Sequence, residues 1–382
     1  MTRTLRVLTL VDAYRFGGAE ILLAQLAAAC PDVDIDMSIV SLSPASMNAP
    51  ETMAALRDAG VKARNLHIRR LLDPTAIPQL VREIRRSECD IVHAHLEMAI
   101  TLALPAAKLT RTPLVCTFHH VASPQTGRAA KREHLAVQAA THSDRAIFVS
   151  EASLSAFQHE HGFAAAPSNW EVLHNGVDLT NFTPGPADPD VRKELGGTDA
   201  PLVVIPGAFR AVKGIPVGIE AWKTVHKKHP DALLSIVGDG ELAGEYRRQV
   251  AEAGLDGAVI FAGSRTDMPN VYRAADIVVA PALHGENFPT VLIEASATGR
   301  PIVSTTAGGI PDIVADRETG LLVEAGDATA LAEAICELLS DRALASKLGA
   351  AAMHRARSEF SATAWASNLR KLYESAIRSD GE

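Results

Sequence analysis

Short apolar runs alternate with amphipathic stretches along most of this chain. The first apolar run, at residues 5–11, is nearly continuous, which is typical of a parallel strand covered on both faces of its sheet. Stretches with helical periodicity follow such runs at residues 21–30, 49–59 and 77–87. This alternation predicts an α/β fold with doubly wound parallel sheets rather than separate layers of helices and strands.

The alternation stops near the middle of the chain and then starts again. A chain of 382 residues is long enough for two domains. The segment NGVD, at residues 175–178, precedes Pro184, Pro186 and Pro189, and we expect this proline series to form an irregular linker. The pattern therefore predicts three parts of the chain: a first domain at residues 1–182, a second domain at 183–361, and a closing segment with an amphipathic helix at 362–382.

The stretch HGENFPTVLIEASATGRPIVSTTAGGIP, at residues 284–311, carries the most informative chemistry. Proline is favoured in the first turn of a helix, and glycine is favoured just after the last turn. A helix is therefore predicted from about Pro289 to just before Gly299. The start of a helix presents unpaired N–H groups and a positive dipole end, which favour a phosphate. Glu294 lies one turn inside this helix and Glu286 precedes it, so two carboxylates could bind hydroxyl groups on either side of a diphosphate. A nucleotide sugar has this layout.

The segment ENFPTVLIE, with Glu286 and Glu294 at its ends, resembles the E-x7-E motif of the family 4 retaining glycosyltransferases. Members of that family have the fold called GT-B. The resemblance implies two Rossmann-like, doubly wound parallel-sheet domains that face a cleft. It places the acceptor on the N-terminal domain and the nucleotide-sugar donor on the C-terminal domain, and it implies that the closing helix packs back on the N-terminal domain.

The resemblance also implies roles for charged residues. Glu286 would face the hydroxyl groups of the donor sugar, and Glu294 would face the ribose. Lys213, in the turn GAFRAVKG, would bind the donor phosphates as a compact positive charge. The family usually has a basic residue where this chain has Ala208, and Arg210 could supply that second charge by a different route.

Two pairs in the first half of the chain join the implied site. The strand-like segment TPLVCTFHH ends in His119 and His120. By the resemblance His119 would lie near the anomeric carbon of the donor, and His120 is the second choice for this role. Gly17 and Gly18 follow the first strand, where backbone without side chains allows a ligand to approach closely.

The implied donor-binding positions continue around the motif. The backbone near Ser264 and Arg265 would contact the nucleobase, since amide groups can read the edge of a base without a dedicated side chain. Within the motif itself, the implied donor-binding residues are Asn287, Phe288, Thr290 and Val291.

The resemblance implies a reaction as well. A sugar would move from a nucleotide-diphosphate sugar, with UDP or GDP as the expected nucleotide, to a hydroxyl group of a glycan, a lipid-linked acceptor or a small molecule. We expect retention at the anomeric carbon by same-face attack, with His119, Lys213 and Glu286 as the catalytic residues. Lys213 and the helix dipole can stabilise the leaving diphosphate, so we expect no metal and no cofactor besides the nucleotide-sugar co-substrate.

Two other functions are compatible with the same residues. A glycoside hydrolase could use Glu286 and Glu294 as a carboxylate pair about 5–10 Å apart, without any nucleotide. A sugar-nucleotide sensor could bind the donor and transfer nothing. Cleavage of a simple glycoside would favour the first alternative, and tight nucleotide binding without a product would favour the second.

Charge, cysteine content and hydropathy limit the kinds of partner and the compartment that we expect for this protein. The formal net charge of −8 argues against a nucleic-acid partner, so a site for an anion has to be local. Four scattered cysteines predict reduced thiols, and no apolar run approaches the length of about 18 residues that spans a bilayer, so we expect a cytoplasmic protein. Arg128, Lys131 and Arg132 suggest at most a weak contact with the inner membrane surface.

A further histidine pair, His93 and His95, ends the strand-like segment DIVHAH. We expect these two side chains to point to opposite faces of the strand and therefore not to chelate one metal ion. One of them would be packed in the core, and the other would lie at the end of the strand.

Overall fold

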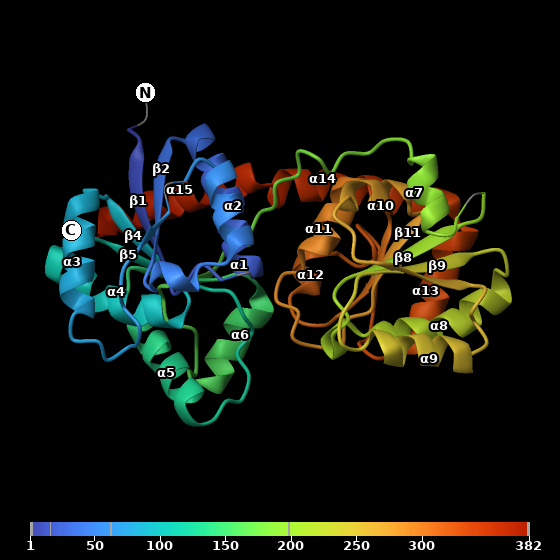
Figure 1. The fold of residues 1–382 in the computed structure, drawn as a ribbon, viewed down its shortest axis with the longest axis horizontal. Coiled ribbons are helices and arrows are strands. Elements are labelled where there is room, and N and C mark those ends of the chain that lie inside the picture. Colours follow the sequence, from blue (N-terminus) through green and yellow to red (C-terminus); the bar gives the residue numbers. More distant parts are fainter. Residues whose placement is uncertain (1–2, 16, 62, 198, 380–382) are drawn as a thin grey trace. The chain divides into compact units, whose positions relative to one another are not determined.

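The computed structural model of the chain describes residues 3–15, 17–61, 63–197 and 199–379. Phe16, in the segment FGGAE, lies outside these residues. The contacts divide the chain into two compact units, unit 1 (Met1–Asp178 and Ser361–Glu382) and unit 2 (Leu179–Phe360). Each unit is an α/β layer structure with its own sheet, as Figure 1 shows, and each has its own apolar core.

Unit 1 contains a sheet of seven parallel strands among its described residues, in the order β3-β2-β1-β4-β5-β6-β7. The strands are β1 (Leu5–Val11), β2 (Ile35–Ser41), β3 (Arg64–Asn65), β4 (Ile91–His95), β5 (Leu114–Phe118), β6 (Arg145–Phe148) and β7 (Trp170–Val172). Strands β4 and β5 are buried along their whole length because helices cover both faces of the sheet. The strand order reverses between β1 and β4, which makes the loops after these two strands the natural place for a ligand.

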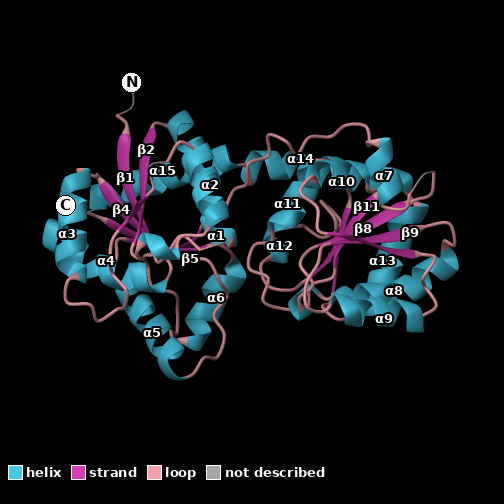
Figure 2. Cartoon of the chain, in the orientation of Figure 1, coloured by secondary structure: helices cyan, strands magenta, loops and turns pink. Residues whose placement is uncertain are grey.

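The helices of unit 1 form one layer on each face of this sheet (Figure 2). One layer consists of α3 (Ala76–Ser87), α4 (Glu97–Thr110), α5 (Gly127–Thr141) and α6 (Glu151–Glu160). The other consists of α1 (Gly18–Ala29), α2 (Pro50–Asp58) and α15 (Ala362–Ser379), with the short 3-10 turns η1 (Cys30–Val33) and η2 (Ala45–Met47) nearby.

Unit 2 repeats this plan with six parallel strands among its described residues, in the order β10-β9-β8-β11-β12-β13. The strands are β8 (Leu202–Pro206), β9 (Leu233–Val237), β10 (Val259–Gly263), β11 (Ile277–Ala280), β12 (Ile302–Thr305) and β13 (Leu321–Val323). The order reverses between β8 and β11, so their carboxyl ends form the equivalent switch point.

Two helical layers also cover the sheet of unit 2 (Figure 1). One layer contains α8 (Ile215–Lys228), α9 (Ala243–Glu252) and α13 (Ala328–Ser340). The other contains α7 (Pro189–Glu194), α10 (Met268–Ala274), α11 (Thr290–Ala297) and α14 (Arg342–Glu359), and the short pieces η3 (Ala211–Lys213) and α12 (Ile310–Ile313) lie in loops. The prediction of two α/β domains with doubly wound parallel sheets is confirmed.

The NGVD segment lies where the chain leaves unit 1. A side chain at Gly176 would place its Cβ 2.3 Å from the carbonyl oxygen of Ser361, so glycine is needed where the chain returns alongside it. Val177 forms an isolated parallel bridge with Ser361, and the helix α15 that follows packs on α1 and η1. The first and last segments of unit 1 are therefore joined by backbone contacts.

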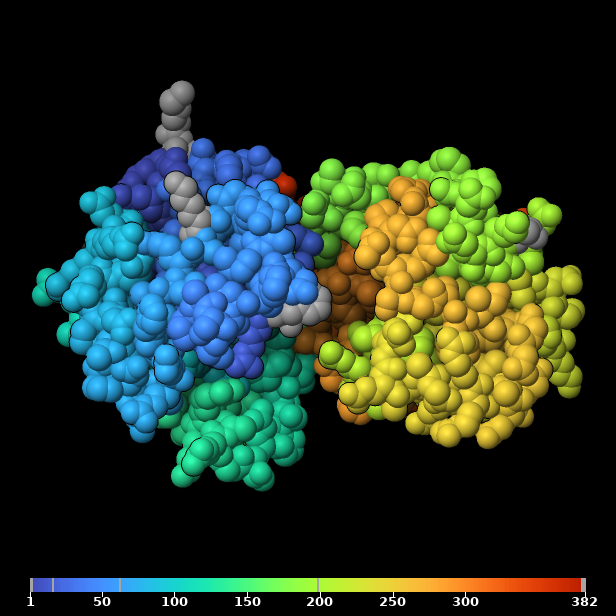
Figure 3. Space-filling view, viewed as in Figure 1, coloured from blue at the N-terminus to red at the C-terminus, as the bar shows by residue number. Residues whose placement is uncertain are grey.

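Two features of unit 2 differ from the sequence-based expectations. Pro189 does not continue an irregular linker, because it begins helix α7 at the first position, where proline is favoured. Asp188 caps that helix by accepting hydrogen bonds from the N–H groups of Asp190 and Val191. The second difference is the long helix α14, which was not predicted. Figure 3 shows one face of unit 2, which is formed mainly by the segments coloured green to orange that precede α14 in the sequence.

A search of the described residues finds no helix that is both long enough and apolar enough to cross a membrane.

Close packing of α14 gives a test of the fold. A Cβ at Gly349, inside α14, would lie 2.4 Å from the carbonyl oxygen of Gly299. Gly349→Ala should therefore lower the free energy of unfolding of unit 2 by about 1–3 kcal/mol through overpacking. Gly244 in α9 is the matched control, because within the part of the chain that the structure describes a Cβ there meets no atom within 4 Å outside the local helix backbone.

Gly244→Ala should leave the stability unchanged or raise it by up to about 1 kcal/mol, since alanine favours a helix more than glycine does. Urea unfolding of both variants measures the difference. A Gly349→Ala protein as stable as the control variant would show that α14 does not pack as described.

Candidate functional site

The two strands at the switch point of unit 2 bring together two predicted catalytic residues. Lys213 lies in the loop after β8, and Glu286 lies in the loop after β11. The ammonium nitrogen Nζ of Lys213 is 2.8 Å from Oε1 of Glu286, and the two side chains are only 26% and 12% exposed. The structure thus pairs a cation and an anion at the sheet edge where ligands bind in such folds.

Glycines shape the backbone that presents Lys213. The aliphatic stem of Lys213 passes 3.7 Å from the position that a Cβ of Gly207 would occupy. Gly214 has a positive φ of 65°, and a Cβ there would lie 1.7 Å from the carbonyl oxygen of Pro281. The glycine of this K-G pair is therefore required for the loop after β8 to contact the segment after β11.

The loop containing Gly308 and Gly309 holds the backbone of Glu286. The N–H of Gly309 donates a 3.0 Å hydrogen bond to the carbonyl oxygen of Glu286. Gly308 has a φ of 57°, and a Cβ there would lie 1.9 Å from the same oxygen. The G-G-x-P segment thus fixes the loop that carries this carboxylate.

The helix predicted after Glu286 begins and ends close to the predicted positions. Helix α11 spans Thr290–Ala297, its N-cap residue is Pro289, and Gly299 beyond its end has a φ of 75°. Proline has no side-chain acceptor, so it does not cap the first N–H groups of the helix. These N–H groups, at Thr290 and Val291, remain suited to an anion.

Glu294 lies one turn into α11 and is held by Tyr272 of α10. The hydroxyl of Tyr272 donates a 3.0 Å hydrogen bond to Oε2 of Glu294. Burial raises the pKa of Glu294, while hydrogen bonds from the side chains of Tyr272 and Thr290 lower it in part. Glu294 is therefore a partly buried acceptor with a fixed orientation rather than a solvated surface acid.

The other predicted donor-binding residues of unit 2 fall into two groups. Phe288 is buried and its ring packs against Phe360 at a centroid distance of 5.5 Å, so its side chain belongs to the core while Asn287 precedes it in the loop. Arg210 and Ser264 are exposed at the surface. Which of these groups contacts a donor stays a prediction.

Arg265 has a structural role for its side chain. Its guanidinium group donates two hydrogen bonds to Asp267, at 2.8 and 2.7 Å, and a third to Glu194 of α7 at 2.6 Å. These partners raise the pKa of Arg265 above its usual value. The predicted role in base recognition therefore concerns the backbone here, because the side chain is already engaged.

Unit 1 gathers three histidines at the ends of β4 and β5. Nδ1 of His95 lies 2.9 Å from Nε2 of His119, and these residues end or follow neighbouring strands. His93 bonds to Thr117 and to the hydroxyl of Tyr373 in α15, each at 2.7 Å. His119 therefore shares a hydrogen bond with the buried side chain of His95, a contact that was not predicted.

The expectation that His93 and His95 point to opposite faces of β4 is wrong. Their ring centroids lie only 4.0 Å apart. Side chains alternate along a strand, so residues two positions apart lie on the same face. Burial lowers the pKa of both residues, that of His93 to about 3, so they are neutral rings packed together at neutral pH.

His120 belongs to a different cluster from His119. Its Nε2 lies 3.1 Å from Oε2 of Glu133, and the other oxygen of Glu133 lies 3.1 Å from Nε2 of His161. Glu97, His120 and Glu133 are the described residues whose ligand atoms are close enough to hold a metal ion. Arg132 is ion-paired with Glu97 in this arrangement, so the predicted basic run has one cation less available for a membrane surface.

Gly17 and Gly18 lie at the start of helix α1. Gly17 is the N-cap residue with an extended backbone, and among the described residues no atom outside the local helix backbone lies within 4 Å of a Cβ built at Gly18. Neither a positive φ nor packing requires glycine at position 18. Close approach of a ligand to this backbone stays a prediction.

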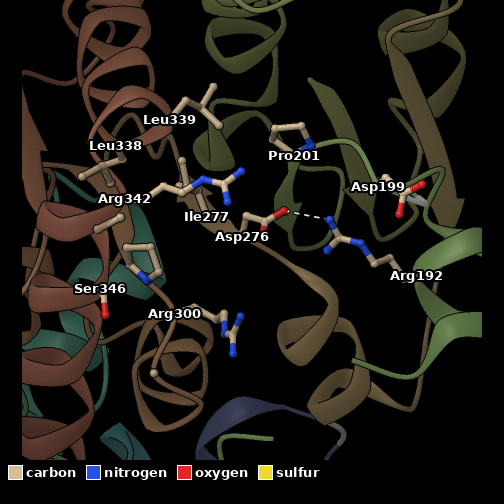
Figure 4. A pocket seen from close by; sticks show the side chains of 13 residues that line it. Arg192, Asp199, Pro201, Asp276, Ile277, Arg300, Leu338, Leu339, Arg342 and Ser346 are labelled. Carbon is tan, nitrogen blue, oxygen red and sulfur yellow. Dashed lines mark hydrogen bonds and ion pairs between the residues drawn. The ribbon is translucent and has the colours of Figure 1, made fainter. Parts of the chain in front are cut away.

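Unit 2 has a cavity away from Lys213 and Glu286 that is larger than the one beside them, and Figure 4 shows it. It has a volume of about 450 Å³, and the side chains of Arg192, Arg300 and Arg342 line it together with Asp276, which pairs with Arg192 at 2.9 Å. The cavity beside Lys213 is only about 10 Å³. The larger cavity nevertheless adjoins the amino ends of β8, β11 and β12, whereas ligands of parallel sheets bind at the carboxyl ends.

Sequence reasoning did not single out Tyr272, and it named His95 without placing it next to His119. Tyr272 stands in the segment NVYRAAD, whose apolar spacing suggests only an ordinary helix. The place of His95 beside His119 could have been found, because polar residues that end two neighbouring strands of a parallel sheet meet at the same edge. The pairing of β4 with β5 supplies that neighbourhood.

Comparison with known proteins adds a family to this geometry. Residues 16–181 match the family model described as Glycosyltransferase Family 4, and residues 200–341 match the one described as Glycosyl transferases group 1. A D-inositol 3-phosphate glycosyltransferase of Corynebacterium efficiens is 31% identical over 310 residues, which cover 77% of this chain and 73% of that protein. A GDP-mannose-dependent monoacylated alpha-(1-6)-phosphatidylinositol monomannoside mannosyltransferase of Corynebacterium glutamicum is 33% identical over 247 residues, 62% of this chain and 64% of that protein.

The fold is similar to that of solved structures. Alr3699/HepE of Anabaena in complex with UDP superposes with a TM-score of 0.84 at 23% sequence identity, covering 97% of this chain and 100% of that chain. The same protein has also been solved with UDP-glucose. This similarity supports the GT-B arrangement of secondary structure within each unit.

The buried histidines predict how acid affects unit 1. Burial lowers the pKa of His93 to about 3 and that of His119 to about 4, with a smaller contribution from neighbouring histidines. An unfolded histidine has a pKa of about 6.5, so between these values the unfolded chain binds protons that the native unit does not. The free energy of unfolding of unit 1 should therefore fall as the pH is lowered from about 6.5.

In the variant His119→Gln one of these groups is absent. The fall in the free energy of unfolding between about pH 6 and pH 4.5 should then be shallower, by at most about 1.4 kcal/mol per pH unit. Urea unfolding of both proteins at several pH values, with pH 7.5 as the reference, measures the slopes. Equal slopes would mean that His119 is not held neutral in the native unit.

Proposed function

Because this chain belongs to the family 4 glycosyltransferases and is a glycosyltransferase, we propose that it moves a sugar from a nucleotide-diphosphate sugar to an acceptor hydroxyl with retention at the anomeric carbon. The observation that carries this proposal is the Lys213–Glu286 pair at the switch point of unit 2, close in sequence to the uncapped start of α11. A cation, a helix N-terminus and a carboxylate are the groups that a diphosphate and a sugar need.

The proposed donor is a sugar linked to UDP or GDP. The Corynebacterium glutamicum relative is named for GDP-mannose, and the Anabaena structure was solved with UDP and UDP-glucose, so both nucleotides are candidates. An oxygen of the diphosphate would replace Glu286 as the partner of the Lys213 ammonium group. The N–H groups of Thr290 and Val291 would bind other oxygens of the diphosphate. The lysine would exchange one anionic partner for another and stay paired throughout.

The remaining donor contacts follow from the same placement. Glu286, released from Lys213, would accept hydrogen bonds from hydroxyl groups of the sugar, and Glu294 would accept them from the ribose. Arg210 would add a second positive charge near the phosphates, and the backbone of Ser264 and the residue after it would contact the base. Asn287 and the backbone of Phe288 would complete the loop that encloses the diphosphate.

The proposed chemistry is a front-face displacement at the anomeric carbon. The bond between this carbon and the diphosphate oxygen breaks, and its electron pair goes to the diphosphate. The acceptor oxygen forms a bond to the same face of the sugar, and its proton passes to an oxygen of the leaving phosphate. Lys213 and the dipole of α11 stabilise the charge that grows on the diphosphate, which is where such stabilisation lowers the barrier.

His119 is proposed to hydrogen-bond to the substrate during transfer, and Gly17 and Gly18 to let the substrate approach the start of α1. His119 is neutral at pH 7, because burial lowers its pKa to about 4. A neutral imidazole can donate or accept one hydrogen bond without adding a charge beside the reacting sugar.

Neither alternative function is favoured. Glu286 is paired with Lys213 and Glu294 with Tyr272, so the two carboxylates are not arranged as a free catalytic pair of a hydrolase. The two relatives described above are named as a glycosyltransferase and a mannosyltransferase rather than as binding proteins. A weak contact of Arg128 and Lys131 with a membrane surface stays a prediction.

Replacement of Lys213 tests the proposal. Lys213→Ala should lower turnover of the accepted nucleotide sugar, followed as release of UDP or GDP, by about 10²–10³-fold, because it removes a charge that stabilises the leaving group. Lys223→Ala is the matched control, since Lys223 lies on α8 of the same unit and its ion-pair partner among the described residues is Glu220, three positions earlier on the same helix. A Lys213→Ala enzyme with the turnover of the control variant would refute the proposed role.

Metal independence can be tested separately. With Lys213 and the helix dipole as the source of positive charge, addition of EDTA in excess should leave turnover of the same nucleotide sugar within about twofold of the untreated enzyme. The measurement is the same release assay, with added Mg²⁺ as the comparison. Loss of activity in EDTA that Mg²⁺ restores would contradict this part of the proposal.

A further inference from the structure

The hydrogen bond between Tyr272 and Glu294 gives Tyr272 a role that the proposed donor contacts do not include. Tyr272 is fully buried, and its hydroxyl lies 3.0 Å from Oε2 of Glu294. The ring packs near Phe182, with centroids 6.0 Å apart, and α10 contacts α11. The position of the hydroxyl is therefore set by the core and not by the solvent.

Unit 2 contains a second buried tyrosine, Tyr246, which serves as a comparison because its hydroxyl makes no hydrogen bond to the described residues. This tyrosine lies in α9, and its hydroxyl is buried. Its ring packs against Phe209 at a centroid distance of 5.4 Å. Packing alone thus explains Tyr246, whereas Tyr272 directs its proton to one oxygen of one carboxylate.

We infer that Tyr272 is a positioning residue for the nucleotide, holding Oε2 of Glu294 so that the other carboxylate oxygen faces the ribose hydroxyls of the bound donor. The inference rests on the proposed function, in which Glu294 binds the ribose. Without Tyr272, Glu294 would keep the hydrogen bond from the side chain of Thr290 but lose the one that fixes Oε2. Its last torsion, which is broad, would then be less restrained, and the carboxylate would meet the ribose in more than one orientation. With Oε2 engaged, the hydroxyl groups of the ribose find one acceptor in one place.

The tyrosine also favours the form of Glu294 that can accept hydrogen bonds. Burial raises the pKa of this carboxyl, and the hydrogen bond from Tyr272 opposes that rise. Burial also raises the pKa of Tyr272 well above its usual value, so its hydroxyl stays protonated and donates. An ionised carboxylate only accepts, which suits a ribose hydroxyl that donates to its remaining oxygen.

Calorimetric titration of the full chain with nucleotides tests this inference. UDP and GDP are titrated first, and the nucleotide that binds more tightly is compared with its 2′-deoxy and 3′-deoxy forms in the wild type, Tyr272→Phe and Tyr246→Phe. Tyr272→Phe should bind the ribonucleotide about fivefold more weakly, as expected for loss of one hydrogen bond. For the deoxy form that already lacks the hydroxyl held by Glu294, the same substitution should change the affinity by less than about twofold.

The control variant Tyr246→Phe should bind every nucleotide as the wild type does, and thermal melting confirms that both variants are folded. If Tyr272→Phe weakens the ribonucleotide and both deoxy forms equally, or weakens none of them, the positioning role is refuted while nucleotide binding stands. If the wild type binds neither UDP nor GDP, the proposed function itself fails. If it binds ribo and deoxy forms equally, Glu294 does not hold the ribose, and the inference fails with that assignment.

Discussion

The ion pair between Lys213 and Glu286 is the interaction on which the account of unit 2 depends. Both side chains are largely withdrawn from solvent, so each charge needs a partner of the opposite sign close by. The pair can form only because the loops after β8 and β11 come together at the switch point of the sheet. Gly214 allows this contact, since any side chain there would collide with the carbonyl oxygen of Pro281.

The segment of residues 284–311, which carries Glu286, could be interpreted from sequence for a local reason. The start and end of α11 follow from local rules, because proline at Pro289 and glycine at Gly299 limit the backbone whatever surrounds them. The same rule also holds in the segment that was predicted to be an irregular linker. Pro189 obeys it as well, and the capping carboxylate of Asp188 just before it marked a helix start rather than a linker.

Contacts between distant segments could not be predicted in this way. Nothing near Glu294 in the sequence indicates that Tyr272 will donate to it, and nothing near Arg265 indicates that Glu194 will bind its guanidinium group. These partners meet because helices α7, α10 and α11 lie in one layer on the sheet. Periodicity predicts that a helix exists, but the choice of neighbours depends on the packing of the whole layer. The histidines of unit 1 show the opposite case, since strand alternation alone places His93 beside His95.

A crystal structure of the chain with bound UDP tests the central claim most directly. The account predicts density for the diphosphate within hydrogen-bond distance of Nζ of Lys213 and of the first N–H groups of α11, with the carboxylate of Glu286 moved away from the lysine. Diphosphate bound among Arg192, Arg300 and Arg342, in the cavity at the amino ends of the strands, would contradict it.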